Sequence, residues 1–224
     1  MVYLARMNDL LEAILHSPLL PEYSERIQAK LREEAERRQR FYEEITEEHK
    51  WEFIEGQVIM HSPAKNRHLF AVKHITMLAS TFVSIHRLGV VHTEKCMCRF
   101  QRNDYEPDVV FFGNDKASKF DSTTMLFPPP DLVVEVLSDS TAERDRGVKF
   151  EDYERHVREY WIVDAEAEVV EQYVATDAGY ELKMKAGNGL LMSAAIPGFE
   201  LPVRAIFDEG ANLEALKNIT SAKP

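Results

Sequence analysis

The chain has 224 residues, of which 45% are hydrophobic and 29% charged, and its formal net charge is −11. This composition is typical of one globular domain, or of one domain with an extension. The acidic balance argues against a protein that coats nucleic acid by electrostatic attraction alone, but it allows binding through divalent ions and a local basic patch. No uninterrupted apolar run approaches the ~18 residues of a membrane helix. The N-terminus also lacks the residue order of a secretory signal, so we expect no membrane association.

The only cysteines are Cys96 and Cys98, which stand too close along one expected strand to bridge easily. A metal site is not indicated either, because no second Cys/His pair lies nearby at the usual spacing. Buried, reduced thiols fit this pattern best, and they favour a cytoplasmic location.

The first 45 residues differ from the rest and predict a charged helical extension. The segment "SERIQAKLREEAERRQRFYEEITEEHK" is dense in charge and free of Gly and Pro, which favours helix. Four apolar residues in it fall at helical spacing: Ile27, Leu31, Phe41 and Ile45. Because Glu34 and Arg38 interrupt this stripe, we expect a solvated helix that docks by its ends. A part in forming a homodimer is also allowed.

Residues 46–224 predict one domain in which strands and helices alternate. Its expected elements, in chain order, are a hairpin around Glu55–Gly56, a helix from Ser62 as N-cap to Gly89, strands at 90–100, 107–112 and 130–137, a helix opened by a capping box of Ser140 and Glu143, a strand at 159–164, a hairpin around 177–179, and a short strand and helix over 199–217. This order is typical of an α/β domain with a mixed central sheet flanked by helices.

Three acids stand inside apolar strands. Glu135 is surrounded by aliphatic residues in "PDLVVEVLSDS", Asp108 precedes a run of Val and Phe, and Glu52 lies between two aromatic residues. An ionised carboxylate in such a strand costs several kcal/mol unless something pairs with it. Converging carboxylates repel one another unless a cation lies between them, and hard oxygen ligands select Mg²⁺, Mn²⁺ or Ca²⁺.

A lysine follows these acids on the next predicted helix. Lys149 shares a helical stripe with Phe150 and Tyr153, which places it on or beside the inward face. An ammonium group there would orient a water molecule or neutralise charge on a phosphate. Together with the acids and a divalent ion, it supplies the parts needed for metal-assisted hydrolysis of a phosphodiester.

Structural interpretations of the same residues stay open. Glu135 would also be satisfied by an ion pair with Lys149 or Arg144. Asp108 would cap a turn after its proline, Lys149 would form a surface pair with Asp145, and the Glu52 strand would expose that acid to solvent.

The histidines give a weaker signal. His68, near the start of the long helix, would approach the site or contact phosphate together with Lys65 and Arg67, or would simply be a polar residue in the first helical turn. The sequence contains no H-E-x-x-H, P-loop, G-x-G-x-x-G or G-x-S-x-G motif.

A set of motifs in fixed order resembles the Uma-two family of endonucleases, which is similar to the PD-(D/E)xK nuclease superfamily. The motifs, which span about residues 46–207, are "WEFIEGQVIMHSP", a histidine at 68, "EPDVVFF", "PDLVVEVLSDST", "RDRGVKFEDY", "VREYWIVD" and "IPGFELPV". The resemblance implies a restriction-endonuclease-like core. It also implies that Asp108, Glu135 and the main-chain carbonyl of Val136 are metal ligands, with Glu52 as the acid ahead of the core.

The chain departs from the superfamily pattern in one respect. Leu137 occupies the place where most members carry the catalytic lysine, and the resemblance implies that Lys149 substitutes for it. Gln57 also stands where the family commonly has Glu.

The expected function is therefore a Mg²⁺- or Mn²⁺-dependent endonuclease that hydrolyses phosphodiester bonds in DNA. Two alternatives remain open. One is a non-catalytic interaction protein that retains the fold and binds partners through its N-terminal helices. The other is a metal-dependent phosphoesterase that acts on a small nucleotide.

Overall fold

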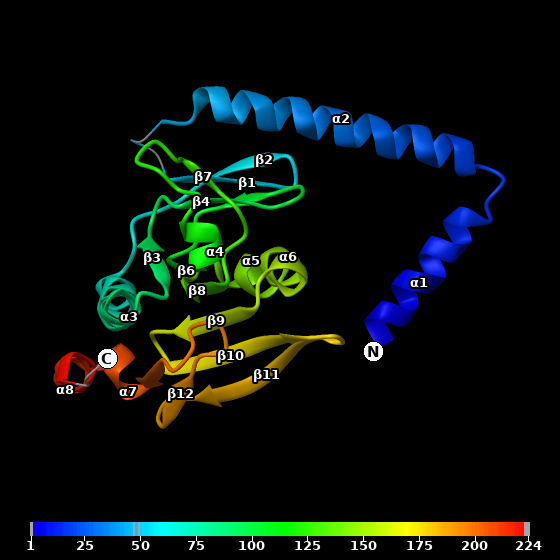
Figure 1. The fold of residues 1–224 in the computed structure, drawn as a ribbon. Helices are drawn as coiled ribbons and strands as arrows, with labels where there is room; N and C mark the ends of the chain where they lie inside the picture. The colour runs from blue at the N-terminus through cyan, green and yellow to red at the C-terminus, as the bar shows by residue number, and fades with distance from the viewer. Residues whose placement is uncertain (1, 47, 49, 222–224) are drawn as a thin grey trace.

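The structure is a computed structural model that describes residues 2–46, 48 and 50–221 (Figure 1). Its helices are α1 Val2–Leu15, α2 Leu20–Glu44, α3 Asn66–His86, α4 Asn114–Ala117, α5 Ala142–Arg146, α6 Val148–His156, α7 Arg204–Phe207 and α8 Glu209–Ser221. Its strands are β1 Trp51–Ile54, β2 Gln57–Met60, β3 Gly89–Thr93, β4 Met97–Arg99, β5 Asp104–Tyr105, β6 Val109–Gly113, β7 Leu126–Phe127, β8 Leu132–Val136, β9 Glu159–Asp164, β10 Val169–Thr176, β11 Gly179–Ala186, β12 Leu190–Met192 and β13 Glu200–Pro202.

A six-stranded mixed sheet forms the centre of the fold, in the order β11-β10-β9-β8-β6-β3. The pair β8–β9 is parallel and the other pairs are antiparallel. Because side chains alternate between the faces of a strand, β8 sends Leu132, Val134 and Val136 into a core with α3, α7 and α8. Val133 faces the opposite side, toward α6. The predicted mixed sheet flanked by helices is confirmed.

The second sheet contains five strands, in the order β2-β1-β5-β4-β7, and covers the other side of the core. Ile54, Cys98 and Tyr105 from this sheet pack in one cluster with Tyr153 of α6. Both cysteines are buried and free, as the sequence predicts.

Helix α3 is long and apolar enough to cross a membrane by length and composition, and it is the one such helix in the described residues. Its apolar character has a structural reason, since Ala71, Ile75, Leu78 and Val83 pack in the main core against the six-stranded sheet.

Helix α2 docks through its C-terminal half, across the five-stranded sheet (Figure 1). Phe41 is buried against Phe53, with ring centroids 5.6 Å apart. Arg38 donates to both carboxylate oxygens of Asp104 at 2.6 Å. The N-terminal half remains solvated, with Ile27 54% exposed. The helix therefore docks only through its C-terminal half. Arg38, which interrupts the apolar stripe in the sequence, holds this half in place through its ion pair with Asp104.

Two predicted boundaries are wrong. The single strand expected over 90–100 is two strands in different sheets, separated by Glu94 and Lys95, whose φ angles are positive. Helix α3 begins at Asn66 instead of following a Ser62 cap, because residues 61–65 run without helical structure along the wall of a cavity.

The expected capping box at the start of α5 is also not formed. Ser140 contacts the hydroxyl of Ser138 instead, and the helix ends at Gly147 before α6 begins.

Candidate metal and phosphate site

Paired strands bring Asp108 and Glu135 together at one end of the central sheet. The antiparallel register of β6 and β8 pairs Val109 with Val134, so the next residues along, Asp108 and Glu135, lie side by side. The backbone N–H of Val136 donates to Asp108 Oδ2 at 2.8 Å. Glu135 projects from the same face of β8 as Val133, toward α6, because strand residues alternate. Both acids are buried, and both line one cavity.

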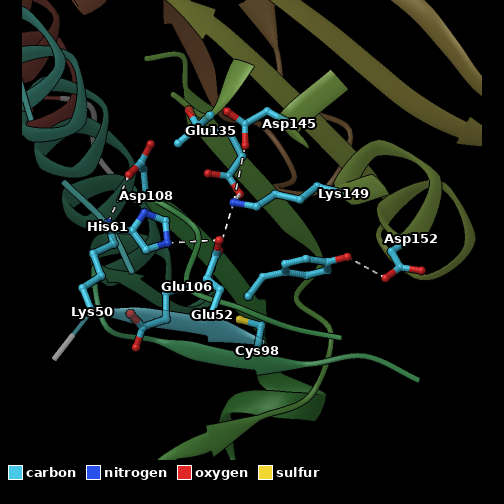
Figure 2. A network of polar contacts seen from close by, with 12 residues as sticks. Lys50, Glu52, His61, Cys98, Glu106, Asp108, Glu135, Asp145, Lys149 and Asp152 are labelled. Atoms are coloured by element: carbon cyan, nitrogen blue, oxygen red, sulfur yellow. Dashed lines mark hydrogen bonds and ion pairs between the residues drawn. The ribbon is translucent and has the colours of Figure 1, made fainter. Parts of the chain in front are cut away.

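Lys149 reaches Glu135 from α6 (Figure 2). Its Nζ lies 3.0 Å from Glu135 Oε1, 2.9 Å from Glu52 Oε1 and 3.4 Å from Asp145 Oδ1. The hydroxyl of Tyr153, one helical turn further along α6, donates to the same Glu135 oxygen at 2.9 Å. The lysine is therefore surrounded by three carboxylates, and the sequence prediction that it faces inward is confirmed.

Glu52 is placed by β1, and it connects the two sheets. It accepts the backbone N–H of Glu106 at 2.9 Å, and its second oxygen lies 3.0 Å from His61 Nε2. Burial disfavours the charged form, but Lys149 and His61 outweigh burial and lower the pKa of Glu52 to about 2. The alternative in which β1 exposes this acid to solvent is wrong, since Glu52 is fully buried.

The pKa of Glu135 is shifted in the opposite direction. Its burial, followed by the nearby carboxylates of Asp145 and Asp108, raises its pKa well above the ordinary value, despite the attraction of Lys149. Burial alone would lower the pKa of Lys149, but the surrounding acids raise it well above its usual range. Three carboxylates, of Glu52, Glu135 and Asp145, thus share one central ammonium group.

Asp108 is held by positive groups on its open side. His68 Nε2 lies 3.3 Å and Lys50 Nζ 3.5 Å from Asp108 Oδ1. Burial opposes ionisation, yet these two groups and the Val136 N–H lower the pKa of Asp108. His68 therefore lies beside Asp108 and lines the same cavity, and its contact with phosphate stays a prediction.

The other two residues predicted to contact phosphate, Lys65 and Arg67, lie in different places. Lys65 lines the cavity and pairs with Asp139 at 2.7 Å. Arg67 is outside the residues that line the cavity and pairs with Glu166 at 3.3 Å.

The sequence interpretation gives no site role to four residues that line the cavity, namely Lys50, His61, Glu106 and Arg144, the last of which it considers only as an ion-pair partner of Glu135. Lys50 stands two residues before Glu52, and the backbone N–H of His61 donates to the Lys50 carbonyl at 3.2 Å. Period-2 alternation and hairpin pairing would have identified both residues. Glu106 and Arg144 carry no such signal, because their places depend on how the two sheets and α5 pack together.

We name the cavity beside these residues the site cavity. It has a volume of about 690 Å³ and is lined by residues of β2, the segment 61–65, α3, β8 and the loop 138–141. Arg144 also lines it, and its Nε is buried without a hydrogen-bond partner among the described residues. Burial raises the pKa of the Glu106 carboxyl in the same wall to about 7, because the pull of Lys50 is not enough to offset it.

The donor set fits a divalent ion of the Mg²⁺ type. Within the described part of the chain, no three His, Cys, Asp or Glu side chains form a ready group for a metal. Mg²⁺ does not require one, since it is usually bound by one or two carboxylates with water and substrate phosphate. Asp108 and Glu135 provide two carboxylates at an open cavity, whereas Glu52 is not among the residues that line it, and its Oε2 is paired with His61 Nε2 at 3.0 Å. A ligand role for the Val136 carbonyl stays a prediction.

Comparisons with known proteins identify the fold and the family of the chain. A crystal structure described as a putative nuclease belonging to DUF820, from Anabaena variabilis, shares the fold with a TM-score of 0.65 and 17% sequence identity. The similarity covers 79% of this chain and 96% of that one. A comparison with curated proteins found no match. A sequence model of the Uma2 family, described as "Putative restriction endonuclease", matches residues 34–204. The chain therefore belongs to the Uma2 family and has a restriction-endonuclease-like fold.

Proposed function

We propose that this protein is a Mg²⁺- or Mn²⁺-dependent endonuclease that hydrolyses phosphodiester bonds in DNA. One observation carries the proposal: Asp108 and Glu135 lie side by side on paired strands at the wall of an open cavity, with Lys149 held between Glu135 and Glu52. Membership of a family described as restriction endonucleases supports the same reaction class.

The residues of the chain have distinct tasks in this proposal. Asp108 and Glu135 would hold a divalent ion, which would supply Lewis-acid charge for a phosphate oxygen. Lys149 keeps Glu135 oriented. It would engage a water molecule or a phosphate oxygen by exchanging Asp145, its most distant partner at 3.4 Å. A charge placed in this buried site before the substrate arrives stabilises a transition state without reorganisation.

Positive groups around the site cavity would bind the phosphates that flank the scissile bond. Lys65 and His68 line the cavity from the start of α3, and the Arg144 guanidinium lines it from α5. This local charge answers the objection from the acidic net charge of −11, because phosphate binding depends on charge near the contact.

Cleavage assays test the proposal directly. Plasmid, single-stranded and double-stranded oligonucleotides, and small nucleotides are incubated with the protein and Mg²⁺ or Mn²⁺. We expect cleavage of DNA that Asp108→Ala and Glu135→Ala each lower at least about 10²-fold. Glu181→Ala, at an exposed strand position, is the control and should cleave like wild type. Thermal unfolding verifies that each variant is folded. Equal cleavage by wild type and Asp108→Ala would refute the proposal, and hydrolysis of small nucleotides alone would identify a phosphoesterase.

A second candidate function is a non-catalytic interaction protein. It is favoured by the ion pair between Lys149 and Glu135 at 3.0 Å, because a purely structural role would use the same contact. Calorimetric titration with Mn²⁺ separates the two functions. Saturable binding that Asp108→Ala removes supports the enzyme, and no binding supports the interaction protein.

Two further parts of the proposal concern the setting of the protein. We infer a homodimer formed through the N-terminal helices, supported by large exposed apolar side chains at Leu10, Leu11, Leu15, Leu19, Ile27 and Leu31. Light scattering of the full chain, with Leu11→Glu and Leu15→Glu as disrupting changes, tests it.

A cytoplasmic location is supported by the two buried free cysteines.

A further inference from the structure

A second cavity, which we name the side cavity, adjoins the site cavity. It has a volume of about 420 Å³ and lies between the end of α2, the turn that joins β3 to β4, and the segment 124–127. Glu94 and Glu106 line both cavities. The two cavities are therefore neighbours, and both reach the side chains of these two acids.

The walls of the side cavity are mainly aromatic and apolar. On one side, α2 contributes Phe41 and Tyr42, whose ring centroids lie 5.7 Å apart. On another, His92 and Phe127 contribute rings with centroids 5.6 Å apart. Aromatic faces of this kind stack on flat heterocycles, and the stacking is worth roughly 1–3 kcal/mol per nucleobase when tested by substitution.

One polar group in this wall lacks a partner. Glu106 is 4% exposed, and its Oε2 is buried without a hydrogen bond among the described residues. A buried carboxylate without a donor is costly, so its position favours a ligand that brings an N–H group. Glu106 stands two residues before Asp108, which limits their Cα atoms to about 7 Å apart. A ligand bound at Glu106 would therefore lie within one nucleotide of a phosphate held at Asp108.

We propose that the side cavity binds one unstacked nucleobase of the DNA whose phosphate lies at Asp108 and Glu135, with Glu106 accepting hydrogen bonds from that base. The inference rests on the proposed nuclease function. A base in this cavity has left its stack, so the substrate is single-stranded or has one base flipped out of a duplex. Guanine suits the carboxylate best, because it presents two neighbouring N–H donors to an acceptor pair.

Binding without a metal isolates this step from catalysis. The full chain is titrated in EDTA with three probes: deoxyguanosine monophosphate, thymidine monophosphate and deoxyribose 5-phosphate. Deoxyguanosine monophosphate should bind at least about fivefold more tightly than deoxyribose 5-phosphate, because only the nucleotide gains stacking. It should also bind more tightly than thymidine monophosphate. Equal affinity for all three probes, or no saturation at millimolar concentration, would overturn the inference.

Different substitutions test the walls of the side cavity and the acceptor role of Glu106. Glu106→Gln keeps the shape and should remove the preference for guanine over thymine while preserving the advantage over deoxyribose 5-phosphate. Met125→Trp adds bulk to the side cavity and should remove that advantage. Met192→Trp is the matched control, since Met192 on β12 is 64% exposed and Met125 58% exposed. An unchanged preference in Glu106→Gln would refute the acceptor role, and equal effects of the two Trp variants would refute the location.

The outcomes also distinguish this inference from the nuclease proposal. Base-dependent binding by a protein that does not cleave DNA would leave the side cavity as a base site and refute the nuclease. Cleavage that depends on Asp108, together with equal binding of the three probes, would refute the side cavity alone.

Discussion

Two buried glutamates on neighbouring strands are satisfied in different ways. Glu159 of β9 is fully buried and accepts four hydrogen bonds from neutral donors at 2.6–2.7 Å: Trp161 Nε1, Gln172 Nε2, Ser193 Oγ and the N–H of Ala195. Glu135 of β8 is 4% exposed, shares one cation with other acids and lines an open cavity. Burial is nearly equal, so burial does not distinguish the acid of the proposed site from the other one. The distinguishing features are an incomplete set of partners and access to a cavity.

The largest difference between the two regions should follow removal of the shared cation. Lys149→Met leaves buried acids without their partner and should lower the free energy of unfolding by about 3–5 kcal/mol at pH 7. Lys149 holds the pKa of Glu52 at about 2, below its unfolded value, so this contribution is present above about pH 4.5 and is lost as the pH falls toward 2.

Urea unfolding at several pH values measures this effect. The control is Lys183→Met, since that lysine pairs with Glu181 on an exposed strand and should cost at most about 1 kcal/mol. A similar small loss for both variants would mean that Lys149 is not the counter-ion of the acids.

A slightly smaller loss of stability is expected when Glu159, whose carboxylate accepts four hydrogen bonds, is replaced. Glu159→Ala removes the acceptor of four hydrogen bonds and should lower the free energy of unfolding by about 3 kcal/mol. Because Glu159 lies on the opposite side of the sheet from the site cavity, the folded variant should keep its cleavage rate. Urea unfolding and a cleavage assay at low temperature check both statements, with the exposed Glu200→Ala as control. Loss of activity in the folded variant would contradict the separation of the two regions.

The wall of the site cavity should also make stability depend on pH, through Glu106. The pKa of Glu106 is raised from 4.5 to about 7, so the folded state holds a proton that the unfolded chain releases. The stability from this group is therefore complete below about pH 4.5 and is lost as the pH rises through 7. Glu106→Gln should match wild type near pH 4.5 and exceed its stability by about 3 kcal/mol at pH 8.

Unfolding curves from pH 5 to 8 measure this difference, and the exposed Glu94→Gln in the same wall is the control. Parallel pH profiles of wild type and Glu106→Gln would contradict the assignment.

The smallest expected effect concerns the rim of the site cavity. Lys65→Ala should weaken DNA binding and make the slope of log affinity against log salt concentration shallower by about 1, because one phosphate contact is lost. Arg67→Ala, two residues further and outside the cavity wall, should leave the slope unchanged. Fluorescence anisotropy with a short oligonucleotide measures both. Equal slopes for the two variants would place the phosphate path elsewhere.

Much of this arrangement could be predicted from local patterns. The aliphatic run around Glu135 and the Val/Phe run after Asp108 specify two buried strands, and the stripe through Lys149 and Tyr153 specifies the inward face of α6. These signals are strong because apolar periodicity reports directly on burial. Lys50 and His61 were within reach of the same reasoning, through the hairpin that they flank.

Other features depended on contacts distant in sequence. The strand expected over 90–100 divides at Glu94 and Lys95 because its two halves join different sheets. Arg38 disrupts an apolar stripe in the sequence, yet it anchors α2 because Asp104 lies 66 residues away in the chain and 2.6 Å away in space. No pattern within either segment contains that pairing.

The sequence by itself indicated that several acids and one lysine lie on inward-facing strands and on a helix face, since their neighbours there are apolar. Tertiary structure alone decided which carboxylate is saturated by hydrogen bonds and which lines a cavity. Glu159 and Glu135 have similar local surroundings, but the donors that saturate Glu159 come largely from β10 and residues 193–195, whereas Glu135 meets Lys149 at the junction of two sheets. Satisfaction of a buried charge is a property of everything packed around it, and so it is settled only when the chain has folded.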